Sequence, residues 1–302
     1  MYKMRVTNSM VVNNLLSNLG HNATRLSKYQ NQVSTGKRIK NLSDDPIGAS
    51  YSIRYATDIG KEHQYMSNIE SSNEILTATE TALTSTNGVL ARIRDLTVQA
   101  SGVQQSENSR QSISVELEEL KQELISLANT SYNGRYIFSG YKTNQKLMAE
   151  DGTYAITVAD TEQINYQISE NNVIQVNTLG TNVFGMGEEG DMPKMIKDLE
   201  KLISAVNSGT PEEISACLTD IDDAQDTVLA SITTIGGKMN RLDLARSRVT
   251  NNLTYLQEAQ SLNDDVNVAE AITNLTAEKS VYNAALQIGA TVIQQSLIDF
   301  IR

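Results

Sequence analysis

Apolar residues recur at alternating steps of three and four positions along much of the chain, which is the spacing of one face of a helix. The first such stripe runs to Gly36, a residue type that often ends a helix. Its apolar members are Val12, Leu15, Leu19, Leu26, Tyr29 and Val33, with Asn22 as the polar exception. The pattern predicts an N-terminal helix whose narrow seam pairs with one other helix as a coiled coil.

Two further helices are predicted in the first half of the chain. One begins at the sequence SDDP of residues 43–46, because Asp caps helix ends and Pro fits the first helical position. Its apolar face is about two residues wide and continues to residues 101–102. The other is expected to end near residues 129–134, and its apolar positions are Ile113, Leu117, Leu120, Leu124 and Leu127.

The longest unbroken heptad series lies in the second half of the chain. After a shorter helix expected over 192–206, a Thr, a Pro and two Glu at 210–213 mark a helix start. The series predicts one helix over 211–261, in which Gly236–Gly237 is the weakest point. One heptad position is apolar throughout: Ile214, Ile221, Val228, Ile235, Leu242, Val249 and Leu256.

A last helix follows Asn263–Asp264–Asp265, which interrupts the pattern and is a candidate helix cap. Its seam carries Val268, Ile272, Leu275, Tyr282, Leu286, Gly289, Ile293 and Phe300, with a second stripe at Ala285, Ile288 and Val292. A helix that is apolar on several sides needs several partners. We therefore expect it to pair with the N-terminal helix on one side and with other copies of the chain on the rest.

The apolar period changes from helical to two in the middle of the chain, where β-branched and aromatic residues alternate with polar ones. Strands are predicted around 154–158, 164–168 and 174–176. The predicted fold class is mainly α with a small inserted β domain, its long helices in coiled-coil and bundle packing and its terminal helices paired. The predicted domains are a terminal coiled-coil core of 1–42 and 263–302, a helical bundle of 43–140 and 186–262, and a β domain of 141–185.

Composition narrows the range of functions. The 302 residues include no Trp, three Phe and three Pro, which favours slender helices packed through aliphatic side chains. The net charge of −11 argues against a nucleic-acid partner, because phosphate binding needs a basic face. The longest apolar runs are too short to cross a membrane, so no membrane partner is expected. The single Cys217 excludes an internal disulfide and favours a buried, unreactive thiol.

Candidate catalytic chemistry has simpler structural explanations. His21 and His63 lie about 40 residues apart on predicted helix surfaces. Residues 185–190 fit the GxGxxG pattern, but Glu188 and Glu189 would repel a pyrophosphate. The paired carboxylates at 44–45 and 264–265 are explained as helix caps. We therefore predict that the chain is not an enzyme and has no catalytic residue, cofactor or metal site.

Four segments carry a family resemblance. They are QVSTGKRI at 32–39 with SDDP at 43–46, LANT at 127–130 with GRYIFSG at 134–140, IGGKMNRL at 235–242, and DDVNVAEAI at 264–272 with SLIDF at 296–300. In this order they resemble the bacterial flagellin superfamily, and more closely its flagellin-like hook-associated proteins at the hook-filament junction. The opening at residues 5–9 departs from flagellins and the β insert is small, and both features favour the junction proteins.

The resemblance implies a structural subunit of the bacterial flagellum, forming an adaptor layer between hook and filament by axial polymerisation of its terminal helices. It implies an extracellular protein that is exported by the flagellar type III apparatus without a cleaved signal peptide. The implied partners are copies of the chain in a ring or helical layer, another hook-associated protein on the hook side, flagellin on the filament side, and an export chaperone.

The assembly interface is predicted on the two terminal helices. Its residues are Val12, Leu15, Leu19, Leu26, Val33, Ile272, Leu275, Tyr282, Leu286, Ile288, Val292, Ile293 and Phe300. Asn22 and Lys279, the polar residues of the two seams, are either tolerated there or fix the register of the pair. Two other functions stay open: a filament flagellin, and an unrelated helical rod of the secretion-needle or receptor-signalling type.

Overall fold

The computed structural model describes residues 8–102 and 107–300, without the side chains of Asn8 and residues 292–300. The described chain divides into two compact units. One, the terminal unit, comprises the residues up to Lys61 and those from Leu253 onward, and the other, the central unit, is Glu62–Asn252. Each unit is thus built from segments far apart in sequence. The three-domain division expected from the sequence stays a prediction.

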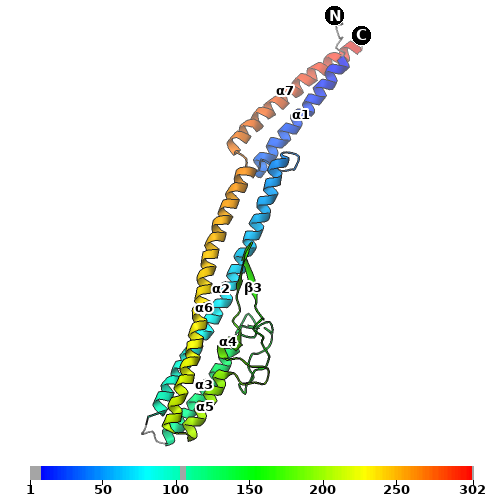
Figure 1. Cartoon of the computed structure of the whole chain (residues 1–302). Coiled ribbons are helices and arrows are strands. Elements are labelled where there is room, and N and C mark those ends of the chain that lie inside the picture. The colour runs from blue at the N-terminus through cyan, green and yellow to red at the C-terminus, as the bar shows by residue number, and fades with distance from the viewer. Residues whose placement is uncertain (1–7, 103–106, 301–302) are drawn as a thin grey trace. The chain divides into compact units, whose positions relative to one another are not determined.

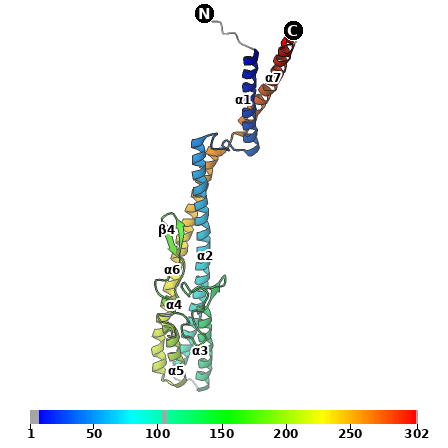
Figure 2. The same ribbon diagram turned by 90° about the vertical axis from the view of Figure 1, so that its right-hand side faces the viewer.

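The terminal unit pairs the first helix of the chain with the last. Helix α1 (Asn8–Thr35) lies beside α7 (Val268–Phe300) in both views (Figures 1 and 2). Leu15 approaches Gly289, Arg25 binds Glu278, and Lys37 bridges to Asp265, so the two helices run antiparallel. The paired terminal helices of the predicted fold class are confirmed.

The predicted helix ends are largely correct. Helix α1 stops at Thr35, and Gly36 follows with a φ of +70°, a conformation that favours glycine. Helix α2 (Pro46–Ala100) begins where the Oδ1 of Asp45 accepts a hydrogen bond from the Gly48 N–H at 3.0 Å.

The predicted cap of the last helix was wrong. Helix α6 (Pro211–Asp264) continues through Asn263 and Asp264, and the side chain of Asn267 instead accepts the Glu270 N–H at 3.4 Å. The side chains of Asn263 and Asp264 are used for contacts with α2, and Asp265 for contacts with Lys37 and Ser261.

The central unit is a bundle of α2, α3 (Glu107–Ala128), α5 (Lys194–Ser208) and α6. The predicted heptad position of α6 is buried over the whole of this unit, and α6 is continuous through Gly236–Gly237. Small polar residues of α2 are also buried, namely Ser72, Thr79 and Thr86. Each hydroxyl donates to the backbone carbonyl four residues earlier, which satisfies it inside the apolar core.

Two short hairpins form the β structure. Strands β1 (Ser131–Tyr132) and β2 (Arg135–Tyr136) pair with each other, as do β3 (Asn165–Ser169) and β4 (Asn172–Gln175). The second hairpin matches the strands predicted around 164–168 and 174–176. A short helix, α4 (Gly180–Phe184), was not predicted, and it packs Phe184 edge-to-face on Phe138 at 5.7 Å between ring centroids.

The strand predicted around 154–158 was wrong. Tyr154, Ile156 and Val158 are buried, as their period-two pattern indicated, but the segment forms only a single bridge, between Tyr154 and Met148. Its other backbone bonds go to loops, for example from the Tyr154 N–H to the Asp191 carbonyl. The Tyr154 hydroxyl donates to the Gly185 carbonyl at 2.5 Å, and burial raises the pKa of this phenol.

Candidate assembly site

The α1–α7 seam is formed by large residues on α1 and by a mixture of large and small residues on α7. Helix α1 contributes the predicted residues Val12, Leu15, Leu19, Leu26 and Val33, all half-buried, with Asn22 buried among them. The least exposed side of α7 steps by four and three through Ala271, Leu275, Glu278, Tyr282, Ala285 and Gly289. At Gly289 an added Cβ would lie 3.1 Å from Leu15, so the glycine permits the close approach.

Several large aliphatic residues of α7 face away from this seam. Ile272 is 48% exposed, Leu286 is 44% exposed and Ile288 is 57% exposed. Of the predicted α7 residues, the structure therefore brings Leu275 and Tyr282 toward α1 and leaves these three uncovered. The side chains of Val292, Ile293 and Phe300 lie outside the described residues.

A charged pair interrupts the apolar seam. The Arg25 Nε donates to the Glu278 Oε1 at 2.9 Å, and the same guanidinium donates to the Asn22 Oδ1. The second carboxylate oxygen of Glu278 is buried and has no protein partner. Lys279, which the sequence placed in the seam, is exposed. Sequence reasoning missed Arg25 and Glu278, because each reads as a solvated charge on its own helix.

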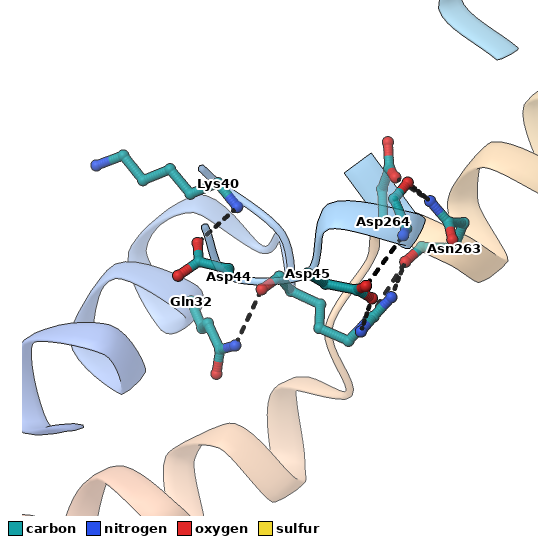
Figure 3. Close-up of polar contacts among 8 residues, drawn as sticks. Gln32, Lys40, Asp44, Asp45, Asn263 and Asp264 are labelled. Carbon is teal, nitrogen blue, oxygen red and sulfur yellow. Dashed lines mark hydrogen bonds and ion pairs between the residues drawn. The ribbon is translucent and has the colours of Figure 1, made fainter. Parts of the chain in front are cut away.

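Below the helix pair, the α1–α2 turn and the α6–α7 turn are joined by a set of polar contacts that we call the clamp (Figure 3). The Arg38 N–H donates to the Asp264 carbonyl at 2.6 Å, and the Val266 N–H donates to the Gly36 carbonyl at 3.0 Å. The Lys37 Nζ binds the Asp265 Oδ1 at 2.5 Å. Main chain as well as side chains therefore hold the two turns together.

Arg38 is the central side chain of the clamp. Its Nη1 binds the Asp45 Oδ2 at 3.0 Å, and its Nη2 donates to the Asn263 carbonyl at 2.9 Å. The other oxygen of Asp45 caps α2. One guanidinium thus links the α1–α2 turn, the start of α2 and the end of α6, as the planar fork of Arg allows.

Asp264 and Asn263 complete the clamp from α6. The buried Asp264 carboxylate accepts from the Ser52 hydroxyl at 2.7 Å and from the Asn263 amide at 2.8 Å. The same amide also donates to the Gly48 carbonyl at 2.8 Å. The two acidic pairs read from the sequence as caps therefore meet in one cluster, in which Asp45 caps a helix and Asp264 binds the start of α2.

The exposed carboxylates of the clamp are stabilised in their charged form. The Gly48 N–H, followed by the Arg38 side chain, lowers the pKa of Asp45 below its ordinary value. The Lys37 ammonium, followed by the Ser261 hydroxyl, lowers the pKa of Asp265. The Asn41 N–H is the largest influence that lowers the pKa of Asp44. These three carboxylates are therefore charged at neutral pH, and their contacts in the clamp weaken in acid.

Residues 6–143 match the family described as the bacterial flagellin N-terminal helical region. The matched residues include α1, the α1–α2 turn of the clamp and α2. The chain resembles the bacterial flagellin superfamily. It is 27% identical to flagellin of Bacillus subtilis over 97% of both chains. It is 25% identical to flagellar hook-associated protein 3 of Escherichia coli, over 93% of this chain and 96% of that protein.

Solved structures of this superfamily share the fold. A putative flagellar hook-associated protein from Vibrio parahaemolyticus matches 73% of this chain and 99% of its own, with a TM-score of 0.66 and 23% identity. Bacillus cereus FlgL matches 69% of this chain and 99% of its own, with a TM-score of 0.58 and 25% identity.

The superfamily is one of structural flagellar proteins, so an unrelated secretion needle or signalling rod is not favoured. Among the described residues, no helix is both long and apolar enough to span a membrane.

Proposed function

We propose that the chain is a structural subunit of the bacterial flagellum that forms the adaptor layer between hook and filament. The observation that carries the proposal is the sidedness of α7. Its less exposed side, which includes Gly289, meets α1, while Ile272, Leu286 and Ile288 remain exposed on a helix already paired. Exposed large apolar groups on a paired helix are typical of a surface that other subunits cover.

The terminal helices supply the contacts that build the layer. Helices α1 and α7 act as one antiparallel body because the seam and the clamp hold them together. The exposed side of α7 then packs against copies of the chain in a ring or helical layer. In this proposal residues 1–42 and 263–302 form the assembly core, 43–140 and 186–262 the bundle, and 141–185 the β domain.

Relatives favour the junction position over a general flagellar role. Hook-associated protein 3 matches along nearly its full length, and the FlgL structure from Bacillus cereus matches across 99% of its chain. The proposed neighbours are another hook-associated protein on the hook side and flagellin on the filament side. Export without a cleaved signal peptide and an export chaperone on α7 belong to the same proposal.

Filament flagellin is the second candidate, because the Bacillus subtilis flagellin matches 97% of this chain. Deletion of the gene from the bacterium that encodes it separates the two candidates. For an adaptor, we expect intact hooks, no filaments, and unassembled flagellin in the medium, with recovery when the gene is restored. Normal filaments in the deletion strain would contradict both candidates. Filaments built from this chain over micrometre lengths would identify it as the flagellin.

A further inference from the structure

Charge is unevenly distributed along the chain. Residues 1–43 contain seven Lys or Arg and neither Asp nor Glu, although the whole chain has a net charge of −11. The remainder is therefore more acidic than the total suggests. Such an asymmetry within one chain favours contacts between unlike regions of two copies.

Much of this basic charge surrounds a pocket of about 190 Å³ at the end of α1. Lys28, Lys37, Arg38 and Lys40 line it, together with Asp44. Lys37 and Arg38 are bound to Asp265 and Asp45. Within the described residues, Lys28 and Lys40 form no ion pair.

The chain itself offsets the charge of these two lysines only in part, through Asp44, whose pKa is lowered first by the Asn41 N–H and also by the charges of Lys28 and Lys40. The carboxylate of Asp44 accepts the backbone N–H groups of Lys40 and Asn41, at 3.3 and 3.0 Å. The C-terminal dipole of α1 contributes only about half an elementary charge. Figure 3 shows the Lys40 side chain extending away from the clamp. Positive charge on these two lysines is therefore left to bind a partner.

Apolar side chains flank the pocket. Leu42, in the turn that carries Asp44, is 68% exposed, and Ile47, in the first turn of α2, is 72% exposed. A surface that joins free cations to exposed aliphatic groups suits a partner with carboxylates beside an apolar residue.

Helix α3 presents that chemistry on its solvent side. Val115, Glu118, Glu119 and Glu123 are exposed, and within the described residues these three glutamates form no ion pair. Glu119 and Glu123 are four residues apart, where like charges on a helix repel each other. A cationic partner would relieve this repulsion.

We propose that the Lys28–Lys40 pocket of one copy binds the acidic face of α3 in a second copy. The contact is heterologous, since two different surfaces meet, and such contacts propagate into rings or helices. This inference rests on the proposed function, because it describes how copies join within the layer. Lys28 and Lys40 pair with Glu118 and Glu119, while Leu42 and Ile47 pack near Val115.

The direct test is cross-linking of a mixture of ¹⁴N-labelled and ¹⁵N-labelled full-length protein with a carbodiimide, which joins a lysine amine to a carboxylate in contact. Mass spectrometry should find mixed-isotope peptides joining Lys28 or Lys40 to Glu118, Glu119 or Glu123. Raising the salt concentration to 1 M should remove them, because it screens exposed charges. Mixed-isotope links from these lysines to other carboxylates only, or none, would overturn the proposal.

Charge reversal gives an independent test of the same contact. K28E/K40E and E118K/E119K should each weaken self-association roughly tenfold, measured by sedimentation, because two attractive pairs become repulsive. The variant that carries all four substitutions should recover most of the lost self-association. The matched control is K146E/K197E, which changes the net charge equally at exposed lysines outside the pocket and should leave association unchanged.

If self-association does not recover in the variant with all four substitutions, and circular dichroism shows that this variant is folded, the proposed pairing is overturned. The gene deletion described above remains informative in either case. Loss of filaments in the deletion strain, with cross-links at other sites, would reject this contact and leave the adaptor function standing.

Discussion

The two helical regions of the molecule bury their apolar residues to different extents. In the central unit, the heptad position of α6 is almost completely buried, and its members are Ile214, Ile221, Val228, Ile235, Leu242 and Val249. In the α1–α7 pair, the apolar seam of α1 is only half-buried, and α7 exposes Ile272, Leu286 and Ile288. The central unit therefore has a core of its own, whereas the terminal pair has an interface that is incomplete until subunits assemble.

The difference follows from the number of layers that cover each helix. A long helix within the bundle is covered by several neighbours, and each fully buried aliphatic side chain contributes about 1.5–3 kcal/mol. Within the terminal unit, α1 and α7 mainly cover each other. Two helices alone are marginal in water, so the contacts of the clamp matter more for stability here than such contacts would in a thick core.

The largest expected effect comes from truncating one leucine in each region. Leu83→Ala in the buried face of α2 should lower the free energy of unfolding by about 2–5 kcal/mol, because it leaves a cavity. Leu19→Ala in α1 should cost less than about 1 kcal/mol in the monomer, because its side chain is already half-exposed. Urea unfolding followed by circular dichroism measures both. Equal losses would contradict the difference between the two regions.

A smaller effect is expected from the clamp. Arg38→Ala removes the contacts with Asp45 and Asn263 and should reduce the stability of the α1–α7 pair by about 1 kcal/mol, since the side chain is partly exposed. Limited proteolysis should then cut the terminal segments faster, at an unchanged rate of cleavage within the bundle. Arg248→Ala, at an exposed position of α6 in the bundle, is the matched control and should change neither rate.

Acid should increase the difference in stability between the terminal pair and the bundle. The pKa values of Asp44, Asp45 and Asp265 lie below the ordinary value of 3.8 in the folded chain. The folded state thus binds fewer protons than the unfolded state, so the stabilisation is complete above 3.8 and is lost as pH falls through the lowered values. Proteolysis with an acid protease should show the terminal pair opening before the bundle. Asp45→Asn with Asp265→Asn should flatten this dependence.

The smallest change in stability is expected from the charged pair in the seam. Replacing Arg25 and Glu278 together by Leu should leave stability equal or slightly higher, because an ion pair whose Arg25 side chain is 49% exposed contributes little, while the leucines extend the apolar seam. The register should become less specific, as it does when a polar seam residue is removed. With Leu15 and Gly289 both replaced by Cys, the two cysteines should form a disulfide efficiently when Arg25 and Glu278 are present. They should do so less efficiently when both charged residues are replaced by Leu. Unchanged cross-linking would reject a role in register.

The sequence predicted the long helices well because their period, caps and breakers agree. Gly36, Pro46 and the heptad series of α6 each mark a boundary or a face that the structure has. The strand around 154–158 was predicted wrongly because alternating burial does not specify a hydrogen-bonding partner. Tyr154 is buried, yet its backbone bonds to a loop more than thirty residues later in the sequence.

The seam of α7 shows another limit of pattern reading. The sequence placed this seam mainly on large apolar residues, with Gly289 among them, whereas the side toward α1 also includes Ala271 and Ala285. Small residues are preferred where helices approach closely, and hydrophobicity alone ranks them below Ile or Leu. The Arg38 contact to Asn263 likewise depends on a tertiary approach between two turns more than 200 residues apart.

Hydrogen exchange of α1 and α7, compared between free protein and assembled flagella, tests most directly whether the terminal pair is completed by assembly. In the free chain, we predict that amides of both helices exchange much faster than those of α6 between Ile214 and Val249. In the assembled layer, the terminal helices should become as protected as the bundle. Equal protection of α1, α7 and the bundle in the free monomer would contradict the account.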